Sequence, residues 1–299
     1  MRYIKQTGYD AIIALEAENC LYEVDKSFSK LGKEPVEVEL HCNDTVKTVT
    51  AEPGATLRGL LDKAGIPGEG QEIKAVHIGY PVGGLFKPDV LDKPLEANLL
   101  YAKRLEAGSM EIHVLCKDVC IVDYMHRLTR ELQSDSCGRC VYCREGMRQL
   151  RRISEDVTTG RHTSDDESLI ELVAGGMQTA GHCLYGRSCG SLWLDVMTTF
   201  RDEFDAHINR KRCDAMVCKK YFTYHILPAK CKGCTECLDV CPCEAIEGES
   251  KYIHVIDTYE CDRCGKCVEV CEYDAIVKAG SIKPRTPDSP IRVGTWRGR

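Results

Sequence analysis

The sequence lacks any run near the 18 or more apolar residues that a membrane-spanning helix requires. Its first residues also lack the apolar core and the small-residue cleavage site of a secretory signal, so we expect a cytoplasmic location. The net charge of −6 argues against nucleic-acid binding, because such binding draws its affinity from clustered lysine and arginine. With 299 residues, 43% of them hydrophobic, the chain can bury a core and has room for two or three domains.

Cysteine is abundant, with 20 residues in the chain. Disulfides are rare in a reducing cytoplasm, so C-x2-C runs indicate metal or iron-sulfur binding instead. Four such pairs lie in a motif that is repeated near the end of the chain, so the cysteines are interpreted region by region.

Hydrophobic periodicity predicts an α+β multidomain chain. Residues 36–50 alternate apolar and polar side chains around an Asn43-Asp44 turn, as a hairpin does. Helical spacing dominates residues 119–210, where Ser164 to Glu167 form a predicted capping box. The predicted parts are an N-terminal helical segment (1–35), a small α+β domain (36–116), a helical cluster-binding domain (117–212), a connector (213–228), a two-cluster ferredoxin domain (229–280) and a basic C-terminal tail (281–299).

The motif C-x2-C-x2-C-x3-C occurs twice between residues 229 and 279. In two-cluster ferredoxins, three cysteines of one such motif bind one 4Fe-4S cluster and the fourth binds the other cluster. A zinc ribbon is the alternative, which the doubled motif disfavours. Glu272 stands where the first motif has Pro242, and Cys243 is interpreted as a small buried residue. The crossed ligand sets are Cys231, Cys234, Cys237 and Cys271 for one cluster, and Cys241, Cys261, Cys264 and Cys267 for the other.

A third cysteine group, Cys137, Cys140 and Cys143, supplies only three ligands for a further 4Fe-4S cluster. The fourth ligand must be distant in sequence. Cys183 is the first candidate, between two predicted helices, and Cys189 is the second. By spacing alone, a zinc site with four cysteine ligands remains an alternative.

Cys213 and Cys218 cannot close a metal site by themselves. Cys120 and His207 would complete a zinc site of three thiolates and one imidazole that pins the ferredoxin domain to the helical domain. The alternatives are a 2Fe-2S cluster, or free thiols beside a histidine that packs on an apolar helix stripe. The cysteines without partner spacing are interpreted as ordinary buried residues: Cys20, Cys42 and Cys116.

The last residues, 281–299, are basic, and their prolines predict no regular structure. Such a segment is either a solvated tail or an arm that becomes ordered on a partner subunit. The charges concerned are Lys283, Arg285, Arg292, Arg297 and Arg299, against Asp288.

The cysteine motifs also resemble those of a known family. Residues 135–146, together with 183–186 and 200–208, resemble the cluster domain of the NADH-binding flavoprotein subunit of respiratory complex I. Residues 108–110 and 120–123 resemble the segment that joins this family's β-grasp (SLBB) domain to its cluster domain. The resemblance therefore implies an SLBB-like β-grasp domain over residues 36–116.

Both ends of the chain carry further resemblance. Residues 3–11 resemble the stretch before the family's flavin domain. The two-cluster ferredoxin region resembles the extension found on beta subunits of electron-bifurcating hydrogenases and related NAD(P)-ferredoxin oxidoreductases. Residues 213–218 are similar to the C-P-A-x-x-C segment of those relatives, with Asp214 in place of proline.

The family's flavin and NADH domain is missing between residues 30 and 36. A Gly-rich loop between a strand and a helix is needed to hold the phosphates of FMN or NADH. The nearest candidate, residues 79–84, contains Pro81 and is interpreted as a turn. We therefore expect no FMN or NAD(P) site and no catalytic residues in this chain.

These observations predict an electron-relay subunit with three 4Fe-4S clusters in a soluble hetero-oligomeric oxidoreductase complex. The resemblance implies two partners, a flavoprotein subunit that binds NAD(P) and another iron-sulfur subunit or ferredoxin, with electron bifurcation as an option. Two alternatives to this prediction stay open. One is that the chain is a flavin-containing NAD(P)H dehydrogenase in its own right, and the other is that it is a structural module whose cysteines hold zinc.

Overall fold

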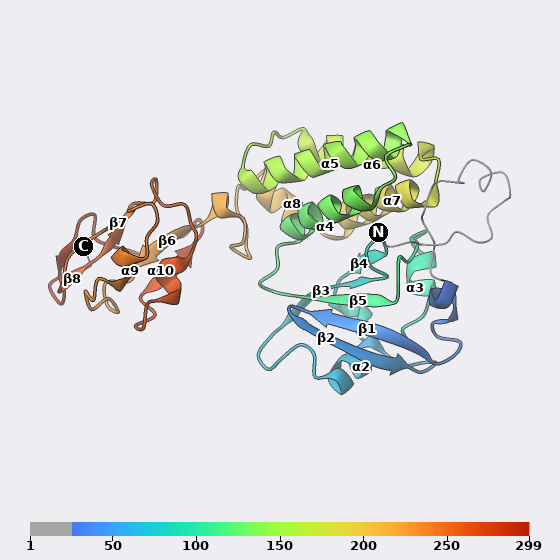
Figure 1. Cartoon of the computed structure of the whole chain (residues 1–299), viewed down its shortest axis with the longest axis horizontal. Helices are drawn as coiled ribbons and strands as arrows, with labels where there is room; N and C mark the ends of the chain where they lie inside the picture. The colour runs from blue at the N-terminus through green and yellow to red at the C-terminus, as the bar shows by residue number, and fades with distance from the viewer. Residues whose placement is uncertain (1–25, 299) are drawn as a thin grey trace. The chain divides into compact units, whose positions relative to one another are not determined.

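The computed structural model describes residues 26–298 (Figure 1). The predicted N-terminal helix up to residue 25, Cys20 and residues 3–11 lie outside this part of the chain. The structure divides into two units, Met1–Arg210 and Lys211–Arg299, and each is described by itself.

A mixed sheet with the strand order β2-β1-β5-β3-β4 begins the first unit. β1 and β2 form the predicted hairpin around Asn43-Asp44, and β5 lies parallel to β1 and antiparallel to β3. Short helices fill the connections, and Thr56 caps α2 by accepting a hydrogen bond from the Gly59 backbone N–H. The elements are η1 (Lys26–Lys30), β1 (Val36–Cys42), β2 (Thr45–Ala51), α2 (Leu57–Ala64), β3 (Ile73–Ile78), β4 (Gly84–Phe86), η2 (Pro88–Val90), α3 (Asn98–Tyr101) and β5 (Glu111–Cys116).

The two faces of this sheet differ in chemistry. Val38 and Leu40 of β1 and Ile112 of β5 are fully buried in the apolar core, together with side chains of α2. The opposite face carries Glu37, Glu39 and His41 of β1 and Glu111 and His113 of β5, because successive side chains of a strand point to opposite faces.

Helices occupy the rest of the first unit and lie on one side of the sheet (Figure 1). They are α4 (Ile121–Asp135), α5 (Val141–Thr159), α6 (Asp166–Ala180), α7 (Leu184–Thr199) and α8 (Arg201–Ile208). The apolar spacing of Leu192, Val196, Phe200, Phe204 and His207 predicts one helix, but the chain breaks at Phe200, whose backbone is not helical, and forms α7 and α8. The predicted capping box is also wrong: Asp165 is the cap of α6, and Asp166 accepts a hydrogen bond from the Thr163 N–H.

The second unit consists of short strands and two short helices around a core that contains cysteines of both ferredoxin motifs. β6 pairs with β10, β7 with β9, and β8 with β11, all antiparallel. The elements are η3 (Lys219–Tyr221), β6 (Thr223–Ile226), α9 (Glu236–Asp239), β7 (Ile246–Glu247), β8 (Tyr252–Ile253), β9 (Val255–Ile256), α10 (Lys266–Glu269), β10 (Ile276–Ala279) and β11 (Ile291–Arg292).

The end of the chain contains regular structure that the sequence did not predict. Ile291 pairs with Ile253 across β11 and β8, and the Val293 N–H donates to the Lys251 carbonyl at 2.9 Å. Ile291, Val293 and Trp296 pack against the core of the second unit. The expectation of a tail without regular structure is therefore wrong for these residues, because their apolar side chains outweigh the nearby prolines.

Candidate iron-sulfur and metal sites

A first small cavity lies in the second unit and is lined by four cysteines. They are Cys231, Cys234, Cys237 and Cys271. The loop before α9 and α9 itself provide the first three, and the turn after α10 provides the last. Most of the remaining wall is apolar, including Ile226 and Val270.

A second small cavity repeats this arrangement. It is lined by Cys261, Cys264 and Cys267 of the second motif and by Cys241 of the first. The structure thus brings together the four cysteines of each crossed ligand set. Tyr224 of β6 closes part of this cavity.

The most buried cysteine of each cavity is a poor thiolate in the absence of a cation. Burial, followed by the neighbouring thiols, raises the pKa of Cys237 to about 12 and that of Cys267 to about 11. Bound iron reverses this balance because a coordinated thiol is deprotonated outright. Four soft donors in an apolar cavity suit an iron-sulfur cluster better than they suit a hard cation.

His254 distinguishes the first cavity from the second. Its Nδ1 lies 3.2 Å from the Cys237 sulfur, and the side chain is 1% exposed. A thiolate ligand can only accept, so the imidazole N–H donates to this sulfur. Gly248 makes room for the ring, since a Cβ there would lie 2.0 Å from His254 Cδ2. The sequence motif gave no signal for this contact.

The helical region gathers a third set of cysteines. Cys140 is the N-cap of α5 and Cys183 is the N-cap of α7, where helix dipoles favour negative charge. Burial, with a smaller contribution from the thiols of Cys183, Cys140 and Cys137, raises the pKa of Cys143 to about 11. The structure therefore brings Cys137, Cys140, Cys143 and Cys183 together.

Cys189, the second candidate for the fourth ligand, lies inside α7 and is fully buried. Burial raises its pKa most, followed by the nearby thiols of Cys143 and Cys183. It therefore lies beside the cysteine set, but in the interior of a helix. Ser136, which sequence reasoning did not single out, places its hydroxyl 3.4 Å from the Cys143 sulfur.

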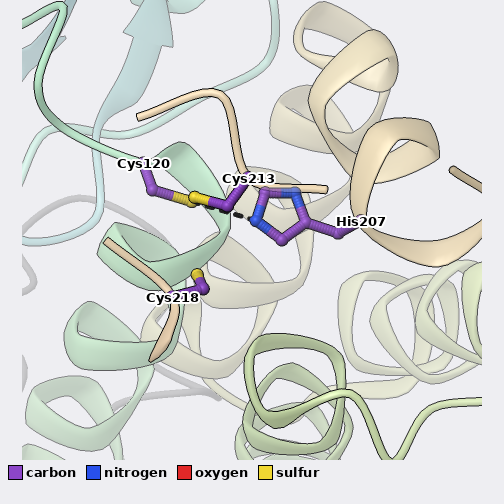
Figure 2. Close-up of side chains that lie close together, drawn as sticks. All are labelled: Cys120, His207, Cys213 and Cys218. Atoms are coloured by element: carbon purple, nitrogen blue, oxygen red, sulfur yellow. Dashed lines mark hydrogen bonds between the residues drawn. The ribbon is translucent and has the colours of Figure 1, made fainter. Parts of the chain in front are cut away.

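Another group of donors consists of Cys120, His207, Cys213 and Cys218 (Figure 2). All four are buried, and their ligand atoms lie within 4.8 Å of one another. His207 Nδ1 donates to the Glu203 carbonyl at 2.8 Å. Its Nε2, 3.3 Å from the Cys120 sulfur, therefore carries the lone pair that a metal ion requires.

Cys120 is held in place by a polar network at the start of α4. Lys74 donates to the Val119 carbonyl at 2.7 Å and forms an ion pair with Glu203. Glu203 also accepts a hydrogen bond from the Ile121 N–H at 3.0 Å. These contacts fix Cys120, the N-cap of α4, beside the α8 residue His207.

The remaining cysteines divide into two kinds. Cys42 and Cys116 are buried as predicted, and their sulfurs lie 3.8 Å apart. Cys243 is only half-buried, so the prediction of a buried residue is wrong; its sulfur lies 3.8 Å from that of Cys241. Within residues 26–298, none of the helices has the length and apolar character needed to cross a membrane.

Comparison with protein families assigns two parts of the chain. Residues 123–207 match the NADH-ubiquinone oxidoreductase-F iron-sulfur binding region. Residues 223–272 match the 4Fe-4S dicluster domain. Over residues 123–207 the chain is related to the iron-sulfur binding region of the NADH-ubiquinone oxidoreductase-F proteins. The predictions of this family relationship and of a ferredoxin-like 4Fe-4S domain in a mixed α/β chain are confirmed.

Individual relatives support the same assignment. The chain is 34% identical over 202 residues to the NADP-reducing hydrogenase subunit HndC of Solidesulfovibrio fructosivorans, covering 67% of this chain and 41% of HndC. It is 30% identical over 160 residues to the F subunit of NADH-quinone oxidoreductase from Mycobacterium tuberculosis (strain ATCC 25618 / H37Rv), covering 54% of this chain and 36% of that protein. The chain thus spans less than half the length of either relative.

Among solved structures, an NAD+-reducing [NiFe]-hydrogenase in the H2-reduced state matches with a TM-score of 0.49 and 22% sequence identity. The match covers 58% of this chain and 29% of that one.

Proposed function

We propose that this chain is an electron-relay subunit that passes single electrons among three 4Fe-4S clusters within a larger oxidoreductase complex. The observation that carries the proposal is the pair of four-cysteine cavities in the second unit. The named relatives are subunits of hydrogenase and NADH-quinone oxidoreductase, which supports a role as one subunit among several. A cytoplasmic location remains a prediction.

The proposed ligands follow from the three cysteine sets. Cys231, Cys234, Cys237 and Cys271 hold one cluster; Cys241, Cys261, Cys264 and Cys267 hold the second; and Cys137, Cys140, Cys143 and Cys183 hold the third. Bound clusters supply one-electron redox chemistry, and the chain sets their potentials through burial and hydrogen bonds to sulfur. No acid-base or nucleophilic side chain is required for this work.

The partner subunits follow from what electron relay requires. We assign nicotinamide oxidation to a flavoprotein partner and the far end of the relay to another iron-sulfur subunit or ferredoxin. The strand order β2-β1-β5-β3-β4 supports an SLBB-like β-grasp domain as a docking module. Such a relay would serve electron bifurcation if the partner flavin performs it.

The Gly-rich residues 79–84 do not favour a phosphate site. They form the turn between β3 and β4, and a Cβ on Gly83 would lie 1.9 Å from the Ile78 carbonyl oxygen. The Gly83 N–H is already used, donating to the Glu106 carbonyl at 2.9 Å. This geometry supports assigning the flavin to a partner.

We also propose that Cys120, His207, Cys213 and Cys218 hold one structural Zn²⁺ ion, because three thiolates and one imidazole form a closed tetrahedral site. Replacing Cys218 with Ser should remove one zinc ion per chain, while Cys243→Ser, outside every ligand set, should remove none. Elemental analysis measures both. The same zinc content in the two variants would contradict the zinc site and would leave the relay proposal unaffected.

The test of the relay is the content of iron, sulfide, zinc and flavin in anaerobically purified protein. Three clusters predict about 12 Fe per chain with matching sulfide. That amount without flavin supports a relay. Tightly bound stoichiometric flavin would instead favour an NAD(P)H dehydrogenase, and zinc in place of iron would favour a structural module.

A further inference from the structure

A polar cluster lies on the sheet of the first unit, away from every cysteine set. The parallel register of β1 and β5 pairs His41 with His113 and Glu39 with Glu111. These four side chains share the sheet face opposite buried Leu40, because side chains alternate along each strand. Two imidazoles and two carboxylates are thereby collected from segments far apart in sequence.

The distances within the cluster fit shared coordination of one ion. His113 Nε2 lies 3.4 Å from Glu111 Oε2, and His41 Nε2 lies 3.9 Å from the same oxygen. Tetrahedral coordination with bonds of about 2.1 Å places ligand atoms about 3.4 Å apart. His41 Nε2 also lies 3.4 Å from Glu39 Oε2, so a fourth ligand is at hand.

The surroundings hold these donors in place. The imidazole of His113 stacks between that of His41, at 4.5 Å, and the phenol ring of Tyr80, at 4.0 Å. The Glu111 carbonyl accepts hydrogen bonds from the N–H groups of Gly79 and Tyr80, which fixes the strand beneath its carboxylate. The stacking holds the rings close together, but the planes of His41 and His113 are only 5° apart, so one imidazole must turn for both Nε2 lone pairs to reach the same ion.

Burial of the cluster is intermediate. The side chains of His41, Glu111 and His113 are 24%, 15% and 22% exposed. A carboxylate and two imidazoles are therefore partly shielded from water, yet they remain open to an ion from solution. At this exposure an ion pair between these side chains alone would add little to the stability of the fold.

We propose that His41, Glu111 and His113 bind one divalent first-row transition-metal ion, with Glu39 or water completing its coordination. Imidazole suits zinc, copper, iron and nickel, and two histidines with one carboxylate form a known zinc ligand set. The site is separate from the cysteine sets, and binding does not change the oxidation state of the metal ion.

Zinc alone is the probe, added to the full chain after its clusters are loaded. Equilibrium dialysis with elemental analysis should find one ion more per chain in the wild type than in His113→Gln. Glu111→Gln, which keeps its shape, should weaken this binding by about tenfold or more, since loss of an outer-shell partner alone costs at least that. The controls His162→Gln and Glu37→Gln, outside the cluster, should bind like the wild type.

Equal zinc uptake by the wild type, His113→Gln and Glu111→Gln would overturn the proposal. X-ray absorption at the zinc edge gives a second readout: subtracting the spectrum of His113→Gln from that of the wild type removes the sulfur-ligated zinc proposed at Cys120, and the added ion that remains must have nitrogen and oxygen neighbours. Sulfur neighbours would assign it to cysteines and would equally overturn the site. Circular dichroism checks that each variant is folded.

Discussion

The two cavities of the second unit are built from one repeated motif, yet their surroundings differ. In the first cavity, Cys231 and Cys237 are both buried and His254 donates a hydrogen bond toward sulfur. In the second, Cys261 is only half-buried, and Tyr224 stands near the cysteines. A shared ligand spacing therefore does not produce equivalent sites, because equivalent wall positions carry different side chains: Tyr224 and His254 each lie seven residues before the first cysteine of a motif.

The largest expected effect is the loss of one cluster when its fourth cysteine ligand, which belongs to the other motif, is replaced. Cys271→Ala should remove the cluster of the cavity that contains His254, although Cys271 belongs to the other motif, because the fourth ligand crosses over. Cys241→Ala should remove the other cluster, and Cys243→Ala should remove none. Iron content and electron paramagnetic resonance of each variant measure the outcome.

If Cys271→Ala instead removed the cluster held by Cys261, Cys264 and Cys267, each motif would bind its own cluster. The crossed assignment would then be wrong.

A smaller effect is expected on the midpoint potentials of the clusters in the two cavities. A hydrogen bond to a cluster sulfur favours the more negative, reduced state. Replacing His254 with Leu should therefore lower the midpoint potential of one cluster and leave the others unchanged. Replacing Tyr224 with Phe provides the matched control, which should leave the first cluster untouched. Redox titration followed by electron paramagnetic resonance resolves the shifts.

The His254 contact would be without redox effect if His254→Leu left all potentials at their wild-type values while the protein kept its full iron content.

The smallest effect concerns the turns that open α9 and α10. Thr235 and Gly265 occupy equivalent places, with φ of 76° and 86°. A residue other than glycine in the left-handed region costs the folded state roughly 1–2 kcal/mol. A new glycine offsets part of the gain, because it raises the conformational entropy of the unfolded chain by an amount worth about 0.4–1 kcal/mol. Thr235→Gly should therefore stabilise the protein by up to about 1 kcal/mol.

Gly265→Ala should destabilise it by about 1 kcal/mol or more, since a Cβ there would lie 3.0 Å from the Tyr224 hydroxyl. Denaturant unfolding of the cluster-loaded protein compares the two variants. A loss of stability in Thr235→Gly would show that Thr235 makes contacts worth more than its backbone strain.

Sequence alone predicts sites whose donors are close along the chain. The ferredoxin motifs define their own ligand sets because spacing and crossover are local rules. Cys183 was predicted from its place in the loop between two predicted helices, and the resemblance to the family includes the same residue. The hairpin and the helices α4 and α5 followed from periodicity, since their apolar faces are long and regular.

Features that depend on tertiary register were not predicted. His254 meets Cys237 only after the chain has folded back, and His41 meets His113 only because β5 pairs with β1. The break at Phe200 is equally invisible in the hydrophobic pattern, because the apolar spacing continues through it into α8. Such contacts have no fixed sequence spacing and must be read from coordinates.

The most direct test of the relay is a reductive titration of the anaerobically purified chain, followed by electron paramagnetic resonance. The account predicts three separate one-electron centres with 4Fe-4S signatures, of which Cys137→Ser removes one and leaves the two of the second unit. Only two centres in the wild type, with a spectrum unchanged by Cys137→Ser, would contradict the account.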